Sequence, residues 1–280
     1  RDEVCEWAIA TLDRVITECK LDYLKWDMNR SLSDLGSSYL PTERQGELTH
    51  RYMLGVYELQ ERLITEFPEL LLENCSSGGA RFDPGMLYYS PQIWCSDDTD
   101  GIERLGIQEG TALVFPLSTM GAHVSDCPNH VLGRSIPFET RGHIALAGTF
   151  GYELDVTKIS EKERNLIPRQ VELYHKHSEL VRDGDYYRVA SYLENHYYDF
   201  YGVVSKDKKR ALFTYVQVLN RPNYKSRIVK IPGLLPDRKY SISGYEGDFY
   251  GSTLAKAGIC IENPKGDFIS RLLEITEVSC

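Results

Sequence analysis

The sequence is poor in positive charge. It contains 32 Lys and Arg residues against 41 Asp and Glu residues, which gives a formal net charge of -9, and its pI is about 5.4. Nucleic acids and anionic membrane surfaces are bound by basic patches, which displace the counterions of their phosphates. The composition therefore excludes nucleic acid and a membrane surface as expected partners and favours a neutral or cationic one.

Long apolar runs and a regular cysteine pattern are also missing. No segment approaches the ~18 consecutive apolar residues of a membrane span, and no signal-peptide pattern opens the chain. The seven cysteines are an odd number, with no C-x-x-C pair and no regular spacing. This usage is typical of a reduced compartment, so we expect a cytoplasmic protein.

What the sequence does contain is an ordered alternation of strand and helix patterns in its first two thirds. Such alternation predicts an α/β fold with a parallel sheet, either doubly wound or a (β/α)8 barrel. The expected strands are 21–27, one that starts at 70–72 and ends within 73–79, 92–95, 120–125 and 149–155, and the expected helices include 2–20, 52–64, 139–147 and 161–181.

After residue 184 the pattern changes to short β-branched and aromatic runs separated by turn residues. This predicts a small antiparallel β-sandwich of five to eight strands. We therefore expect two domains, an α/β domain over residues 1–184 and a C-terminal β-sandwich over residues 185–280.

One strand pattern, LDYLKWDMNR, ends in a carboxylate, Asp27, where the polar loop begins. Parallel α/β proteins keep their chemistry at such strand ends. Lys25 lies two residues earlier and so points to the same side of the strand, where its ammonium favours an ionised Asp27. An ionised carboxylate suits a nucleophile or general base; the alternative is a buried Lys25–Asp27 ion pair without a reaction.

A second acidic segment, SDDTD, begins with Ser96 and Asp97 and follows the apolar run that contains Trp94. Crowded like charges and an apolar neighbour favour a protonated carboxyl, as a general acid requires. Two carboxylates in contrasting environments are typical of glycoside hydrolysis. Two alternatives remain: Asp97 or Asp98 as the cap of the next helix, and a calcium loop, although the D-x-D-x-D-G register is not met.

Two further groups of residues are considered. Cys75, followed by Gly78 and Gly79, is interpreted as a ligand wall, with a reactive thiol and a buried structural thiol as alternatives. His123, Cys127 and His130 suggest a zinc site, but C-x-x-H occurs without a second pair. His123 alone has two other possible roles, a hydrogen bond to a sugar or support of a loop. We expect no metal and no cofactor.

Three long motifs, LKWDMNR, ENCSSGGARFDPGMLYYSPQIWCSDDTDGIERL and MGAHVSDCPNH, strongly resemble the retaining α-galactosidases of glycoside hydrolase family 36. The resemblance runs in order and spacing over about residues 1–185. It implies that Asp27 is the nucleophile and Asp97 the acid/base, and that Lys25, Asn29, Cys75 and Gly78 contact the substrate. It also implies a (β/α)8 barrel followed by a β-sandwich. Cys95 departs from the threonine that is common in the family.

The activity implied by this resemblance is hydrolysis of terminal α-galactosyl residues of melibiose- or raffinose-type oligosaccharides by double displacement. Full-length relatives in this subgroup are typically homo-tetramers. Two alternatives remain within the enzyme class, a relative acting on α-N-acetylgalactosamine and one that transfers galactose to an acceptor. A third alternative is a non-catalytic carbohydrate-binding protein.

The resemblance also implies that this chain contains only part of the barrel. The Asp27 strand would be the fourth of the barrel, so about five of the eight strands that closure requires are present. Arg1, Asp2 and Glu3 lead into a helix without a start methionine, and we expect the chain to be the C-terminal part of a longer enzyme. An open sheet edge predicts that the isolated chain is aggregation-prone and nearly inactive.

Overall fold

A computed structural model describes residues 1–29, 33–224 and 226–278. Arg30, at the end of the LDYLKWDMNR motif, and Cys280, one of the seven cysteines, lie outside the described residues. The chain forms two compact units, Arg1–Asp97 (unit 1) and Asp98–Cys280 (unit 2), and each is described by itself. Within the described part, no helix is long and apolar enough to cross a membrane.

Unit 1 contains a three-stranded parallel sheet in the order β1-β2-β3 with flanking helices. Its elements are α1 (Asp2–Cys19), β1 (Tyr23–Asp27), the 3-10 helix η1 (Thr42–Glu47), α2 (Leu48–Glu66), β2 (Leu71–Cys75), α3 (Pro84–Tyr89) and β3 (Gln92–Ile93).

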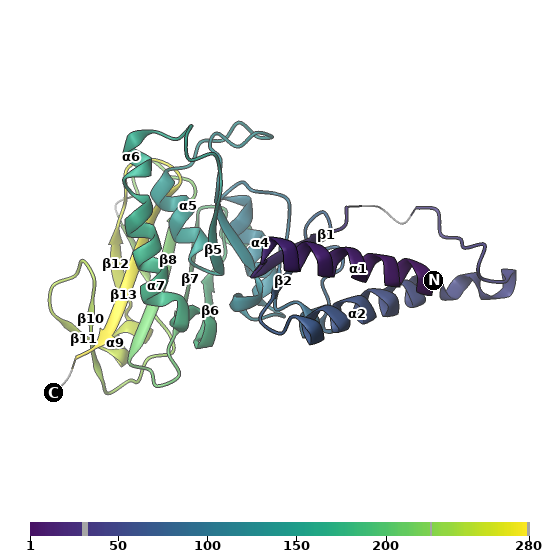
Figure 1. Ribbon diagram of the computed structural model, residues 1–280. Helices are drawn as coiled ribbons and strands as arrows, with labels where there is room; N and C mark the ends of the chain where they lie inside the picture. The colour runs from purple at the N-terminus through teal and green to yellow at the C-terminus, as the bar shows by residue number, and fades with distance from the viewer. Residues whose placement is uncertain (30–32, 225, 279–280) are drawn as a thin grey trace. The chain divides into compact units, whose positions relative to one another are not determined.

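The two long helices of unit 1, α1 and α2, lie side by side (Figure 1) because each turns an apolar stripe inward. Ile9 and Ile16 of α1 are buried in one cluster with Leu63 of α2 and Leu72 of β2. Helix α2 ends at Glu66, close before a proline that cannot continue a helix. The predictions of both helices and of the strand that ends at Asp27 are confirmed.

Unit 2 contains a two-stranded parallel sheet, β4-β5, and two antiparallel sheets with the orders β11-β10-β13-β8-β7-β6 and β12-β9. Its helices are α4 (Glu103–Ala112), η2 (Leu117–Thr119), α5 (Phe138–Ala145), α6 (Glu161–Arg164), α7 (Ile167–Asp183), α8 (Tyr192–Asn195) and α9 (Gly251–Lys256). Its strands are β4 (Gly121–Ser125), β5 (Thr149–Glu153), β6 (Asp185–Ala190), β7 (Tyr198–Val204), β8 (Arg210–Gln217), β9 (Ser226–Val229), β10 (Lys239–Ile242), β11 (Asp248–Tyr250), β12 (Ile259–Glu262) and β13 (Ile269–Glu277).

Two adjacent interior strands of the six-stranded sheet, β7 and β8, are buried on both faces. One face, with Phe200 and Phe213, shares a core with residues of the small β12-β9 sheet. The other face, with Tyr201 and Val216, packs against residues that include Ile102 and Ile144. Helices α5 and α7 lie along the sheet on this side in Figure 1 and contact β7, β8 and β13.

One expectation about a single element is wrong. The predicted helix over 161–181 is two helices, α6 and α7, because Ser160 caps α6 through a capping box while Pro168 lies in the first turn of α7. Strand β2 starts at Leu71 and ends at Cys75, within the segment 73–79 where its end was predicted. The short elements α3, α8, α9, β11 and β12 were not expected from the sequence.

Candidate active site

The candidate site lies at the carboxyl end of the three-stranded sheet of unit 1. The last pair of the β1-β2 register is Asp27 opposite Cys75. On the other side of β2, Glu73 and Asn74 pair with Gln92 and Ile93 of β3. Asp97 is the fourth residue after the end of β3. Because the strands are parallel, these chain segments leave the sheet at the same edge. The side chains of Asp27 and Asp97 are both exposed to solvent.

Asp27 is held by a donor from its own loop and lies beside β2. The amide Nδ2 of Asn29 donates to Asp27 Oδ2 at 3.0 Å, and Cys75 lies directly opposite Asp27 in the strand register. Asn29 is itself fixed, since its Oδ1 accepts from the backbone N of Ser77 at 2.8 Å. The structure therefore brings together three of the residues that the sequence predicts, Asp27, Asn29 and Cys75.

The Cys75 thiol is a neutral group in this site. Cys75 is buried, and burial raises the pKa of its thiol, partly opposed by the backbone N–H of Gly78 and assisted by the carboxylate of Asp27. A raised pKa keeps the sulfur protonated near neutral pH, whereas a nucleophilic cysteine needs the thiolate. The geometry therefore favours the ligand-wall interpretation of Cys75 over a reactive thiol.

The loop after β2 requires glycine at residue 78. Gly78 has a φ of +83°, and a Cβ atom there would lie 2.6 Å from the Cα of Ser96 and 3.2 Å from the backbone N of Asp97. Its neighbour Gly79 donates from its N to Cys95 O at 3.0 Å. A side chain at residue 78 would be strained and would collide with the segment that carries Asp97. The loop therefore contacts the surroundings of both carboxylates.

Asp97 accepts a hydrogen bond from the indole of Trp94, whose Nε1 lies 3.1 Å from Asp97 Oδ1. Trp94 itself is buried at the end of β3, where its backbone N donates to Asn74 O. From the sequence, this tryptophan is expected to be an apolar neighbour that favours a protonated carboxyl. In the structure it is a directional donor that fixes one oxygen of Asp97 from the sheet.

Lys25 makes its ion pair with a different carboxylate from the one expected. Its Nζ lies 3.6 Å from Oε1 of Glu73 on β2, and 5.0 Å from the ring centroid of Trp94. The alternative of a structural Lys25–Asp27 ion pair is thus replaced by a Lys25–Glu73 pair across the sheet. The strand register explains this, because Lys25 and Glu73 lie directly opposite each other.

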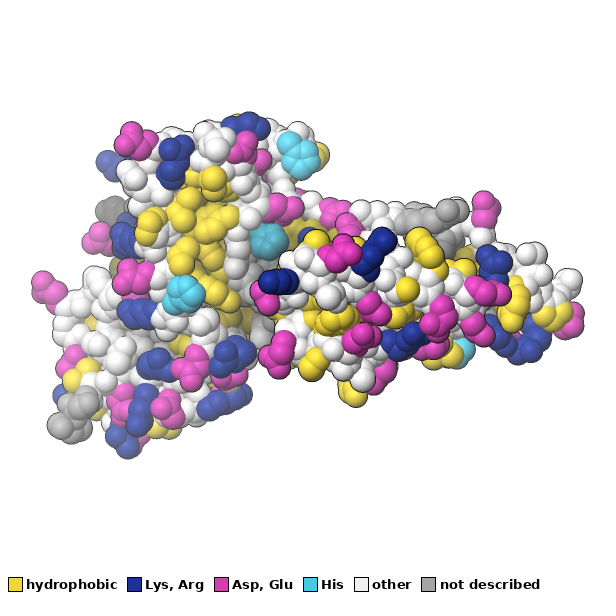
Figure 2. Space-filling view, viewed as in Figure 1, with side chains coloured by type: hydrophobic (Ala, Val, Ile, Leu, Met, Phe, Trp, Pro, Cys, Tyr) yellow, Lys and Arg dark blue, Asp and Glu magenta, His cyan; other side chains and the backbone are white. Residues whose placement is uncertain are grey.

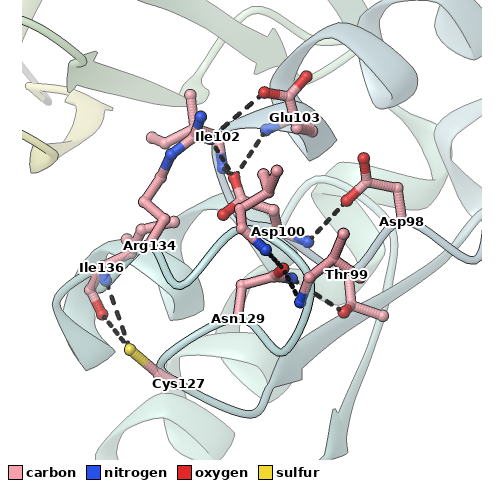
Figure 3. A network of polar contacts seen from close by, with 11 residues as sticks. Asp98, Thr99, Asp100, Ile102, Glu103, Cys127, Asn129, Arg134 and Ile136 are labelled. Carbon is pink, nitrogen blue, oxygen red and sulfur yellow. Dashed lines mark hydrogen bonds and ion pairs between the residues drawn. The ribbon is translucent and has the colours of Figure 1, made fainter.

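The rest of the acidic segment belongs to unit 2 and holds its own loop together (Figure 3). Asp98 Oδ1 accepts from the backbone N of Asp100, and Asp100 Oδ1 accepts from the backbone N atoms of Ile102 and Glu103. Arg134 Nη1 pairs with the same Asp100 oxygen at 2.5 Å. Asp100, and not Asp97 or Asp98, therefore satisfies the free N–H groups at the start of α4, which corrects the capping expectation.

His123 and Cys127 of the zinc hypothesis have other partners. His123 Nδ1 lies 3.3 Å from Glu153 Oε2, and Cys127 Sγ accepts from the backbone N of Ile136 at 3.4 Å. Among residues 1–29, 33–224 and 226–278, no group of three or more His, Cys, Asp or Glu side chains is placed to hold a metal ion.

Sequence reasoning missed two residues behind the site. Glu73 was placed at the end of a strand and given no role, but it is buried in β2, where Oε2 accepts from Gln92 Nε2 at 2.8 Å and from the hydroxyl of Tyr23. Arg81 donates from Nη2 to the backbone O of Cys75 at 2.8 Å. The sequence contained a signal for Glu73, because a charged residue next to apolar strand residues needs a buried partner. It contained no such signal for Arg81.

Comparisons with known proteins agree with this geometry. Two family models match the chain, melibiase over residues 1–184 and the glycosyl hydrolase family 36 C-terminal domain over residues 198–275. The α-galactosidase AgaA of Geobacillus stearothermophilus is 45% identical over 278 residues, and Mel36A of Lactobacillus acidophilus is 42% identical over 279. These matches cover 99% and 100% of this chain but 38% and 37% of the two relatives.

Solved structures give the same result. The crystal structure of AgaA in complex with raffinose superposes with a TM-score of 0.96 at 44% identity and covers 99% of this chain and 38% of that one. The α-galactosidase from Lactobacillus brevis superposes with a TM-score of 0.96 at 40% identity, covering 100% of this chain and 38% of that one. The chain thus spans little more than a third of the length of these relatives. Since the melibiase model alone matches more than half of its residues, the chain belongs to the melibiase family, glycosyl hydrolase family 36.

Proposed function

We propose that this chain supplies the two catalytic carboxylates of a retaining α-galactosidase that removes terminal α-galactosyl residues from melibiose- or raffinose-type oligosaccharides. One observation carries the proposal. Two exposed carboxylates, Asp27 and Asp97, follow strands of one parallel sheet and border the same glycine loop. The relatives add support, because AgaA and Mel36A are both named α-galactosidases and AgaA structures contain raffinose and stachyose.

The mechanism that fits two such carboxylates is double displacement. Protonated Asp97 gives its proton to the glycosidic oxygen while the carboxylate of Asp27 attacks the anomeric carbon, so that the C–O bond to the leaving group breaks and an ester to Asp27 forms. Asp97, now ionised, takes a proton from water while the water oxygen attacks the anomeric carbon. The new bond between this oxygen and the anomeric carbon forms as the ester bond to Asp27 breaks. Galactose leaves with its anomeric configuration retained, and both carboxyl groups return to their starting states.

The neighbouring residues would serve this reaction by binding and orientation. Asn29 donates to Asp27 and fixes one of its oxygens, and Cys75 lies opposite Asp27 in the strand register, so that both residues lie beside the anomeric carbon. Lys25 presents an ammonium on the same face of β1 as Asp27, where it can donate to a sugar hydroxyl. Gly78 permits a close approach of backbone to the sugar, since no side chain is tolerated there.

For the architecture we propose an incomplete (β/α)8 barrel over residues 1–184, with about five of eight strands, followed by a β-sandwich over residues 185–280. The five parallel strands β1 to β5 occur in two separate sheets, and the edge strand β5 is only half-buried. Figure 2 shows hydrophobic side chains gathered at the surface of unit 2 where Figure 1 labels α5, α7 and β5. A core shared by the two antiparallel sheets supports the sandwich.

Two expectations about the cellular setting remain proposals. A cytoplasmic location is supported by the described cysteines, Cys5, Cys19, Cys75, Cys95, Cys127 and Cys260, which are all free thiols. A homo-tetramer rests on the resemblance alone.

The test compares the 280-residue chain with a chimera in which it replaces the matching segment of AgaA. With 4-nitrophenyl α-galactoside and raffinose, we expect turnover from the chimera and almost none from the chain alone, because the sugar pocket needs the other barrel strands. In the chimera, Asp27→Gly should abolish turnover, and azide should restore release of 4-nitrophenol by forming the β-galactosyl azide. Normal turnover of Asp27→Gly would remove Asp27 from the nucleophile role.

Two further assays separate the competing activities. The same chimera is given 4-nitrophenyl α-N-acetylgalactosaminide, and an acceptor sugar is added to the α-galactoside assay. Preference for the N-acetylated substrate, or transfer products that exceed free galactose, would replace hydrolysis of α-galactosides as the main activity. Sugar binding without turnover in the chimera would favour the carbohydrate-binding alternative.

A further inference from the structure

The buried carboxylate of Glu73 is not needed by the mechanism proposed above. Glu73 lies in β2 with 1% of its surface exposed, and burying a carboxylate is costly unless it is paired and hydrogen-bonded. Replacing a buried ion pair by apolar residues is often neutral or stabilising. Stability alone therefore does not explain a glutamate in the middle of this strand.

The contacts of Glu73 lead across the sheet toward Asp97 in three steps. Glu73 Oε1 pairs with Lys25 Nζ at 3.6 Å. Lys25 Nζ lies 5.0 Å from the ring centroid of Trp94, within the range of a cation–π contact. The indole Nε1 of Trp94 donates to Asp97 Oδ1 at 3.1 Å.

The other contacts of Glu73 hold it at one end of this series. Its Oε2 accepts from Gln92 Nε2 at 2.8 Å and from the Tyr23 hydroxyl, so all three strands of the sheet fix the carboxylate. Lys25, in contrast, keeps about a third of its side chain exposed and has a long flexible stem. A fixed buried anion opposite a flexible cation restricts where the cation can lie.

We propose that Glu73 is a positioning residue for the acid/base Asp97. It holds the Lys25 ammonium over Trp94, and this contact keeps the indole oriented so that its N–H fixes one oxygen of Asp97 and leaves the other for the glycosidic oxygen. The inference rests on the proposed function, since it gives Glu73 a role only if Asp97 transfers a proton.

The test uses the leaving group of the substrate as the readout. Departure of a sugar alkoxide from raffinose needs proton transfer from Asp97, whereas 4-nitrophenolate leaves with little help. In the AgaA chimera, Glu73→Gln keeps the shape of the side chain and removes its charge. We expect kcat on raffinose to fall about tenfold to a hundredfold, the effect of one charge-assisted contact. On 4-nitrophenyl α-galactoside, kcat should change less than about threefold.

Two further variants and one control test whether Glu73 acts on Asp97 through Lys25 and Trp94. Trp94→Phe keeps a ring under Lys25 but removes the donor to Asp97, and it should show the same dependence on the leaving group. Glu73→Gln added to Lys25→Met should cost almost nothing further, because coupled residues are not additive. Glu69→Gln makes the same charge change at an exposed residue of unit 1 and should leave both substrates unaffected.

Equal losses on both substrates, or additive losses with Lys25→Met, would overturn the proposal, since a residue that only supports the fold does not distinguish leaving groups. Unfolding midpoints of the variants show whether each chimera is folded when it is assayed. The control for the proposed function is separate. If Asp27→Gly is inactive and rescued by azide while Glu73→Gln behaves as the parent, only the inference about Glu73 fails.

Discussion

The two central sheets of this chain differ in how their strands are covered. Strands β7 and β8 of unit 2 are buried along almost their whole length, between one core shared with the β12-β9 sheet and another that includes residues of α4 and α5. Strand β1 of unit 1 is exposed at both ends and only half-buried between them. All the candidate catalytic and substrate-contact residues lie in the less covered region, unit 1.

The difference in burial assigns stability mainly to the antiparallel sheet and chemistry to the parallel sheet. A strand buried on both faces contributes apolar area and few accessible polar groups, so β7 and β8 are suited to hold the fold. A strand end that is open to solvent can present carboxylates to a substrate. The antiparallel sheet is therefore expected to respond to mutations in stability and the parallel sheet in turnover, and the predictions below test this division.

The largest effect is expected at Asp97. In the AgaA chimera, Asp97→Ala should lower kcat on raffinose by about a hundredfold to ten thousandfold, the usual contribution of general acid–base catalysis, with a smaller loss on 4-nitrophenyl α-galactoside. The control is Asp98→Ala, one residue later, whose side chain accepts from the backbone N of Asp100. A greater loss from Asp98→Ala than from Asp97→Ala would reassign the acid/base within this segment.

The next effect compares two leucines on strands. Leu273 in β13 is 3% exposed and Leu71 in β2 is 42% exposed. Leu273→Ala should lower the free energy of unfolding of the chain by about 2–5 kcal/mol, because it leaves a cavity in a closed core. Leu71→Ala should cost less than about 1 kcal/mol, as a largely exposed side chain loses little buried area. Urea unfolding of both variants measures the difference.

The same pair of variants in the AgaA chimera tests the incomplete barrel. Leu71 shares one face of β2 with Glu73 and Cys75, the face that would line the interior of a closed barrel. Completion of the barrel should cover Leu71, so Leu71→Ala should then lower the unfolding midpoint as clearly as Leu273→Ala does. A Leu71→Ala chimera as stable as its parent would argue against closure over this face.

Much of the fold could be predicted from the sequence because local patterns decide it. The apolar spacing of α1 and α2 and the strand that ends at Asp27 need no distant partner to be recognised. The break between α6 and α7 was missed because Pro168 was interpreted as lying near the start of one helix, whereas it begins a second one. Short strands such as β11 and β12 are fixed by their pairing partners rather than by their own residues.

The site was predictable to a different degree. Asp27 and Asp97 were proposed from strand ends and from the family motifs. Asn29 donates to Asp27 and Cys75 lies opposite it, while their contacts with substrate stay a prediction. The partner of Lys25 was not found, because a same-strand neighbour two residues away was preferred over Glu73, a residue 48 positions later that register brings opposite. Cross-strand pairs follow from register, which a single sequence does not reveal.

The pH dependence of stability is expected to come from unit 2, where the buried side chains of Asp199 and His143 have strongly shifted pKa values. Burial raises the pKa of Asp199 to about 7 and lowers the pKa of His143 to about 4. Relative to ordinary values near 3.9 and 6.5, Asp199 makes the folded state less stable as pH rises from about 4 to 7. His143 makes it more stable as pH rises from about 4 to 6.5. The two slopes oppose each other over most of this range.

Two variants should separate these slopes. With Asp199→Asn, whose amide oxygen can still accept from the backbone N of Tyr192 as the carboxylate does, the unfolding free energy should increase from pH 4.5 to 6.5. With His143→Gln it should decrease from pH 4.5 to 7. Urea unfolding at several pH values measures both. A parental pH profile in Asp199→Asn would mean that Asp199 is ionised in the folded protein throughout this range.

The smallest effect is expected at the start of α6, outside both sheets. Ser160 accepts from the backbone N of Glu163, while Glu163 Oε2 accepts from the backbone N of Ser160, so Ser160→Ala removes one half of a capping box. Loss of such a cap costs about 0.5–2 kcal/mol. Because α6 and α7 are separate helices, the loss should stay within the four residues of α6 and fall at the low end. Ser160→Asp, which keeps an acceptor, should be close to the parent. A destabilisation by Ser160→Ala as large as that of Leu273→Ala would mean that α6 supports the buried sheet, and the division between covered strands and surface helices would then need to be redrawn.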